Sequence, residues 1–144
     1  MQAFRFRLAK VLEWYTTQYE LEERRLNACL AALEDARQAI VALQAEHQAV
    51  EREMVVRSSI EAREFVALGL YRLGVKKRQV ELEIARDRCQ AEVQAQRARL
   101  EAAQRRLRLV EKLRERRVAE HVYAESRELD ELAADAYFAK WAAR

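Results

Sequence analysis

The side chains capable of chemistry are few, and they stand far apart in the sequence. His47 and His121 each lack a nucleophile or a second ligand at a useful spacing. Cys29 and Cys89 are too few to form a metal site or a disulfide scaffold. The sequence also contains no glycine-rich phosphate loop and no Ser, His and Asp set. We therefore expect no catalytic residue, no metal site and no cofactor, in a protein that is not an enzyme.

Positive charge in the second half of the chain is the strongest remaining chemical feature. Residues 72–117 hold 15 basic and 7 acidic side chains, whereas residues 118–144 hold 3 and 6. The densest basic residues are Arg105, Arg106, Arg108, Lys112, Arg114, Arg116 and Arg117. A basic helix can bind a phosphate backbone, but Glu101, Glu111 and Glu115 partly neutralise this one and no nucleic-acid-binding motif accompanies it. We expect no nucleic-acid partner and favour an acidic protein surface.

The composition indicates that long helices position these side chains. The 144 residues include no proline, two glycines and 35% charged residues, and the common residues Ala, Glu, Arg and Leu are good helix formers. The longest uncharged hydrophobic stretch, residues 65–71, is far shorter than the roughly 20 residues of a membrane-spanning helix. Arg5, Arg7 and Lys10 resemble the start of a signal peptide, but Glu13 interrupts the apolar run that should follow. The sequence thus predicts a soluble, cytoplasmic protein with no transmembrane segment.

A heptad pattern runs through the first third of the chain. Only Glu22 and His47 interrupt its apolar character, and Leu8 extends it backwards. Its positions alternate by three and four residues without a slip: Leu12, Tyr15, Tyr19, Glu22, Leu26, Cys29, Leu33, Ala36, Ile40, Leu43, His47, Val50 and Met54. One helix cannot bury its own stripe, so this pattern predicts a partner helix.

A second, more polar seam supplies that partner. It runs through Phe65, Leu68, Arg72, Val75, Gln79, Leu82, Arg86, Cys89, Val93, Gln96, Leu100, Ala103, Leu107 and Val110. Two steps of four residues, through Arg114 to Val118, then shift the phase and predict a local change of supercoil. The pattern resumes at Val122, Glu125, Leu129, Leu132 and Ala136.

The chain must reverse between the two seams. Ser58 and Glu61 have the spacing of a capping box, in which the serine oxygen accepts a free amide and the glutamate reaches back, so a second helix should begin near Ile60. Gly69 and Gly74 are the competing turn signal, because each costs about 1 kcal/mol inside a helix relative to alanine. We favour the serines, with helix one at about 4–57, a reversal at about 57–61 and helix two at about 61–142.

A reversal at Ser58 and Ser59 fixes the expected register. Residues at one level then have numbers that add to about 118, which places Cys29 opposite Cys89 as two small core thiols and Leu8 opposite Val110. The predicted fold is all-α, a single antiparallel coiled-coil hairpin over residues 1–144 whose second helix is longer than the first. Everything after Val110 should overhang, with a bare apolar stripe that is typical of a binding surface. Its residues are Val118, Val122, Leu129, Leu132, Tyr137 and Trp141.

Both ends of the chain resemble a known family. The opening motif is Phe4-Arg5-Phe6-Arg7-Leu8 followed by Val11-Leu12 and by Glu20, Glu22 and Glu23, and the closing motif runs from Glu125 through Leu129-Asp130-Glu131-Leu132-Ala133. In these motifs, and in length and layout, the chain resembles the flagellar export protein FliJ family and the related, YscO-like stalk proteins of type III secretion injectisomes. It departs from family members that have a glycine-containing reversal, because Ser58 and Ser59 stand there.

The resemblance implies a non-enzymatic stalk or adaptor, similar to the rotor shaft of F-type ATPases. Such a stalk promotes assembly and activity of the hexameric export ATPase, contacts the membrane export gate, escorts export chaperones and associates peripherally with the inner-membrane export apparatus. By position, the ATPase-binding residues would be Phe4, Phe6, Leu8, Leu129, Asp130, Leu132 and Trp141. The gate-binding residues would be Leu43, His47, Phe65, Leu68, Tyr71 and Arg72.

Three other interpretations stay open at this point. The injectisome stalk proteins are close relatives of that family, so the motifs leave the export system undecided. A generic homo-oligomeric coiled coil would pair the overhangs of two chains with each other. A nucleic-acid-binding coiled coil would use the Arg-rich stretch.

Overall fold

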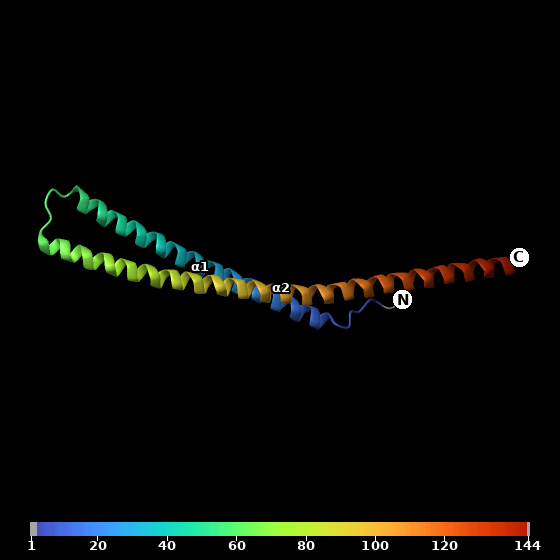
Figure 1. Cartoon of the computed structure of the whole chain (residues 1–144). Coiled ribbons are helices and arrows are strands. Elements are labelled where there is room, and N and C mark those ends of the chain that lie inside the picture. The colour runs from blue at the N-terminus through green and yellow to red at the C-terminus, as the bar shows by residue number, and fades with distance from the viewer. Residues whose placement is uncertain (1–2, 144) are drawn as a thin grey trace. The chain divides into compact units, whose positions relative to one another are not determined.

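The computed structural model describes residues 3–143 and contains two α-helices packed against each other (Figure 1). Helix α1 spans Ala9–Val56 and α2 spans Ala62–Ala142. No strand occurs within residues 3–143. The predicted all-α hairpin with a longer second helix is confirmed. The expected start of helix one near residue 4 is wrong, because residues 3–6 are irregular and residues 7–8 form a turn.

The packing of the chain divides it into two units. The loop-end unit is Leu21–Leu100, and the terminal unit contains the described residues up to Glu20 and those from Glu101 onward. Each helix contributes a segment to both units. The prediction of a single domain stays a prediction.

The seam of the loop-end unit follows the predicted register. Every predicted α1 seam position from Glu22 to Met54 is buried or half-buried, with Leu33 the most enclosed residue of α1. Gln96 of α2 bonds to Glu22 of α1, and His47 of α1 packs on Tyr71 of α2 with ring centroids 5.9 Å apart. Residue numbers rise along one helix as they fall along the other, so the pairing is antiparallel. Both pairs add to 118, as the sequence predicted.

The reversal lies at the serines rather than at the glycines. Residues 57–61 are not helical, whereas Gly69 and Gly74 lie inside α2. The predicted capping box is wrong by one turn: the Glu61 amide, at the N-cap, donates to Glu64 Oε2 at 3.2 Å. Arg57 Nη1 donates to the other oxygen of Glu64 at 2.9 Å. The Glu61 amide first, and then the Arg57 guanidinium, lower the pKa of Glu64 below its ordinary value.

The first turns of α2 correct the predicted seam. Phe65 is 66% exposed, and Arg72 is an exposed residue that forms an ion pair with Glu51. Leu68 is buried as predicted, whereas Glu64 and Tyr71 turn toward α1 in place of Phe65 and Arg72. The cap explains why other residues of α2 face α1 than predicted. Its hydrogen bond to the Glu61 amide holds the Glu64 side chain on the side of the loop. From Val75 to Val110 the predicted α2 positions are buried or half-buried within their own units.

In the terminal unit, an irregular arm replaces the expected first turns of helix one. Phe4 packs edge to face on His121 of α2, with ring centroids 5.5 Å apart. Arm residues and Leu113, Arg117 and His121 line a common hollow. Beyond Val110 the half-buried positions of α2 are Leu113, His121 and the predicted Glu125, so the predicted path through Arg114 and Val118 is wrong, although consecutive four-residue steps still shift the phase. The bare part of α2 therefore starts later than Val110, and every described residue from Ser126 onward is exposed.

Replacing either glycine of α2 by alanine should stabilise the protein. A Cβ added at Gly69 or Gly74 meets no atom within 4 Å, and neither glycine has a positive φ. Gly69→Ala and Gly74→Ala should each raise the free energy of unfolding by about 1 kcal/mol, because alanine loses less backbone entropy in a helix. Urea unfolding followed by circular dichroism measures this, and the reverse change Ala85→Gly should lower stability by a similar amount. Stability that is unchanged or lower in both alanine variants would contradict the assignment of these glycines to the helix interior.

Candidate interaction surfaces

The terminal segment of α2 carries one candidate surface. Leu129, Leu132 and Trp141, three of the predicted ATPase-binding residues, have side chains that are 51% to 73% exposed. Asp130 is exposed between them. Tyr137 and Phe138 are also exposed, and their rings meet edge to face with centroids 6.1 Å apart. This segment therefore combines apolar and aromatic side chains that nothing in the described chain covers.

Acidic side chains surround that apolar surface. Within the described residues 126–143, one of them has a basic partner: Arg127 Nη2 lies 3.1 Å from Glu131 Oε1. The other carboxylates of residues 126–143 are those of Glu128, Asp130 and Asp135, which are exposed. The bare end of α2 is thus amphipathic and acidic, and it suits a partner that offers apolar contacts bordered by basic groups.

The arm places the other predicted ATPase-binding residues differently. Phe4 and Phe6 are half-buried, whereas Leu8 is 37% exposed. The ring of Phe4 packs on His121 within the terminal unit, and the ring of Phe6 is half-buried there. The structure therefore separates the predicted set into an exposed α2 group and an arm group that is mostly covered.

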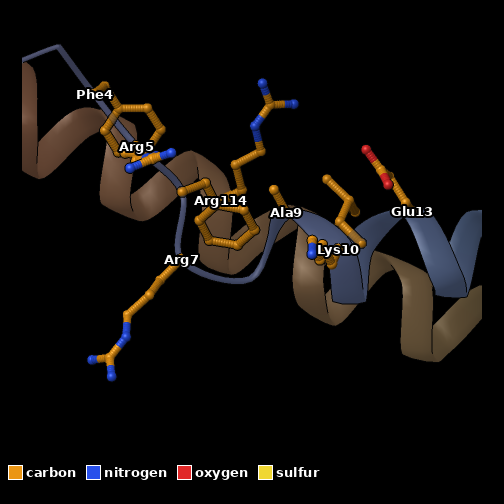
Figure 2. A pocket seen from close by; sticks show the side chains of 9 residues that line it. Phe4, Arg5, Arg7, Ala9, Lys10, Glu13 and Arg114 are labelled. Carbon is orange, nitrogen blue, oxygen red and sulfur yellow. The ribbon is translucent and has the colours of Figure 1, made fainter.

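A basic hollow lies beside the arm. Figure 2 shows the side chains around it, with Arg114 coming from α2. Its four basic residues are Arg5, Arg7, Lys10 and Arg114, and Glu13 is the only acidic residue among those that line it. The first turn of α1 contains no acidic side chain that would offset its positive end. This side of the terminal unit is electropositive, in contrast to the acidic end of α2.

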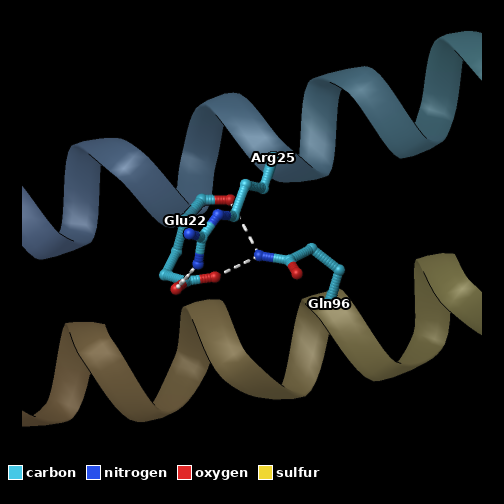
Figure 3. Close-up of polar contacts among 3 residues, drawn as sticks. All are labelled: Glu22, Arg25 and Gln96. Carbon is cyan, nitrogen blue, oxygen red and sulfur yellow. Dashed lines mark hydrogen bonds and ion pairs between the residues drawn. The ribbon is translucent and has the colours of Figure 1, made fainter.

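A polar contact inside the seam sets the register of the loop-end unit (Figure 3). Gln96 is 4% exposed, and its Nε2 donates to the main-chain oxygen of Glu22 at 3.1 Å and to the Glu22 carboxylate. Arg25 Nη1 lies 2.8 Å from the other carboxylate oxygen. A slip of the helices would strand these groups without partners, so the contact selects one alignment.

Removing one partner of this contact should cost more than removing both. Gln96→Leu should lower the free energy of unfolding by about 1 to 3 kcal/mol, because it leaves the Glu22 carboxylate short of a donor inside the seam. The double variant Glu22→Leu/Gln96→Leu should be as stable as the natural protein or more so. Urea unfolding compares them. Gln79→Leu is the control, since Gln79 bonds only to Glu83 on its own helix. A Gln96→Leu protein of undiminished stability would contradict the role of this contact.

Most of the predicted gate-binding residues face the seam. Leu68 is buried, and Leu43, His47 and Tyr71 are half-buried. Phe65 alone among them is an exposed apolar side chain. The predicted gate-binding residues thus lie near the reversal, but most of them pack between the helices and are not exposed to a partner.

Arg72, the last of that set, joins a polar group between the helices. Its Nε and Nη2 donate to the two carboxylate oxygens of Glu51 at 2.6 and 2.7 Å. His47 Nε2 lies 3.9 Å from Glu51. The hydrogen bond from Arg72, more than its charge or that of His47, lowers the pKa of Glu51 below its ordinary value of 4.5. This geometry ties the two helices together and holds no nucleophile.

The ion pair of Glu51 and Arg72 should make stability near the reversal depend on pH. A lowered carboxyl pKa contributes stability that is complete above the ordinary value of 4.5 and is lost as the pH falls through the folded-state pKa. Glu51→Gln should therefore be less stable than the natural protein at about pH 7, and the difference should close toward about pH 3. Urea unfolding at both pH values measures it, with the exposed Glu46→Gln as the control. A difference that persists unchanged at acid pH would contradict this account.

Two exposed apolar surfaces were missed by the sequence analysis. The tip patch consists of Val55, Val56, Ile60 and Phe65, at the reversal. The outer stripe consists of Val66, Leu70, Leu73, Val80 and Ile84 on α2, each 49% to 67% exposed. The spacing of the outer stripe is present in the sequence, but the predicted positions were those of the seam that pairs the two helices.

Within residues 3–143, neither helix has a stretch long and apolar enough to cross a bilayer. The same residues hold no group of three or more His, Cys, Asp or Glu side chains placed to bind a metal ion, and Cys29 and Cys89 are free, half-buried thiols. Comparison with protein-family models, curated proteins and solved structures finds no match.

Proposed function

We propose that this protein is a non-enzymatic stalk of a type III export ATPase, in the flagellar export system. The bare end of α2 carries the proposal: it is a continuous helix with exposed apolar and aromatic side chains and an acidic border. A lone helix end of this kind suits insertion into the central hole of a hexameric ring, where the ring's own side chains would cover it. The FliJ-like motifs at both ends of the sequence support the same role. An injectisome stalk would perform the same task, and the genomic neighbours would distinguish the two systems.

The loop end would contact the membrane export gate. Of the predicted gate-binding residues, only Phe65 offers a largely exposed apolar side chain, and Val55, Val56 and Ile60 extend it into the tip patch. We therefore assign the gate contact to the tip patch, with Leu43, His47, Leu68, Tyr71 and Arg72 supporting it from the seam. The stalk would act in the cytoplasm, peripherally at the inner-membrane export apparatus, and would escort export chaperones.

Mixing the protein with its cognate ATPase tests the proposal. The full chain should increase hexamer formation and ATP hydrolysis, and deletion of residues 118–144 should abolish the increase. Leu132→Asp and Trp141→Ala should each reduce it several-fold without altering the fold, because both side chains are exposed.

Val41→Asp is the matched control for that experiment. Val41 is an isolated exposed apolar residue on α1, so its replacement should leave the stimulation unchanged. Circular dichroism of each variant checks that the helices persist. If the full chain has no effect on the ATPase, or if the Leu132 and Trp141 variants stimulate as well as the natural protein, the proposal is wrong.

A further inference from the structure

The outer stripe lies on the side of α2 away from α1. An α-helix turns about 100° per residue, which places Val66, Leu70 and Ile84 opposite the seam residues Leu68, Val75 and Val93. Leu68 and Val93 are buried, whereas the outer residues are about half exposed or more. The stripe advances by four and three residues in alternation, with Lys77 as its single polar position: 66, 70, 73, 77, 80 and 84. This is the spacing of a coiled-coil seam, and no part of the described chain covers it.

The terminal segment of α2 carries a second stripe with the same spacing. The terminal stripe is Val118, Val122, Glu125, Leu129, Leu132 and Ala136. Its apolar members other than alanine are 37% to 63% exposed, and Glu125 is its single polar position. Two six-level seams with identical steps therefore occur on one helix. The outer one is exposed at its apolar levels, and the terminal one is exposed except at the half-buried Glu125.

The two stripes match when they are aligned antiparallel. Residue numbers at one level then add to 202. Five levels join apolar residues: Val66 with Ala136, Leu70 with Leu132, Leu73 with Leu129, Val80 with Val122, and Ile84 with Val118. The sixth level joins Lys77 to Glu125, so the only polar position of each stripe meets the opposite charge of the other. A parallel alignment lacks this match, because it sets Leu73 against Glu125 and Lys77 against Leu129.

The flanking positions agree with the same alignment. In an antiparallel coiled coil, the flanking position just before every second seam residue, here Leu70, Lys77 and Ile84, faces its equivalent on the partner. This brings Lys76 beside Glu128, a second pair of opposite charge. On the other flank, Ala67 meets Ala133 and Gly74 meets Ser126, so small residues there let the helices approach closely. The match spans 19 residues, or about 28 Å of helix.

We propose that the occupant of the outer stripe is the terminal stripe of a second copy of this chain, paired antiparallel in the register that sums to 202. Both stripes belong to one continuous helix, Ala62–Ala142, which cannot fold back on itself, so the pairing requires another chain. This proposal does not rest on the proposed function. The proposed pairing differs from a dimer in which two terminal stripes pair with each other. Such a dimer would bring like acidic charges together.

Sedimentation of the full chain from about 1 µM to about 500 µM tests the pairing. The natural protein should self-associate. Lys77→Glu and Glu125→Lys should each weaken association about tenfold, because each replaces an attraction by a repulsion inside the seam. The double variant Lys77→Glu/Glu125→Lys should restore it, and a mixture of the two single variants should associate better than either alone. Val41→Asp, outside both stripes, should associate like the natural protein.

Cysteine cross-linking between chains tests the direction of the pairing. In a Cys29→Ser/Cys89→Ser background, a Leu70→Cys chain mixed with a Leu132→Cys chain should form a mixed disulfide. A Leu70→Cys chain mixed with a Val122→Cys chain, which only the parallel alignment would bring together, should not. A protein that stays monomeric over the whole concentration range overturns the proposal. So does association that the charge reversals leave unchanged, association that the double variant fails to restore, or cross-linking in the parallel arrangement.

Discussion

Each helix of this protein has only the other helix to bury its apolar seam, and this constraint governs the rest of the structure. With two helices there is no third layer, so burial is confined to one stripe on each. Within residues 3–143, Leu33, Leu68, Val93 and Ala103 are the only buried apolar residues. Apolar burial alone specifies such a seam weakly, since a slip by one heptad would bury similar side chains. The contact between Gln96 and Glu22 therefore matters more than its modest energy suggests, because it is satisfied in only one alignment.

The seam of α1 was the most predictable part of the molecule. Its alternation of three and four residues expresses a single physical demand, burial on one face, and no local feature competes with it. The start of α2 was predicted less well, because two candidate caps stand within one turn. Glu64 reaches the amide of Glu61 and also meets Arg57, so the later cap makes two charge-assisted contacts. That choice turns Glu64 and Tyr71 toward α1 and leaves Phe65 in solvent.

In the arm, the apolar residues were recognised, but they were read with the period of a helix and not with that of an extended segment. The alternation of Phe4, Arg5, Phe6 and Arg7 has a period of two, which is typical of an extended segment with one face buried. The structure follows it: the two phenylalanines are half-buried and the two arginines exposed. Because the heptad pattern was extended backwards through Leu8, the alternation was overlooked and the start of helix one was predicted too early. Which residues of α2 the arm covers could not be predicted, because a short extended segment has no register of its own until it meets a partner.

Exposure alone does not identify a functional surface in a protein of this kind. Two helices cannot enclose every apolar side chain, so isolated exposed residues such as Val41 are the normal result of the architecture. Repetition is more informative, because a row of apolar side chains at alternating steps of four and three costs solubility along its whole length. The outer and terminal stripes each contain one charged position, of opposite sign, at levels that coincide only in the antiparallel register. The same argument separates the two kinds of end: the tip patch is a cluster without a period and suits contact with a folded surface, whereas the stripes suit a helix.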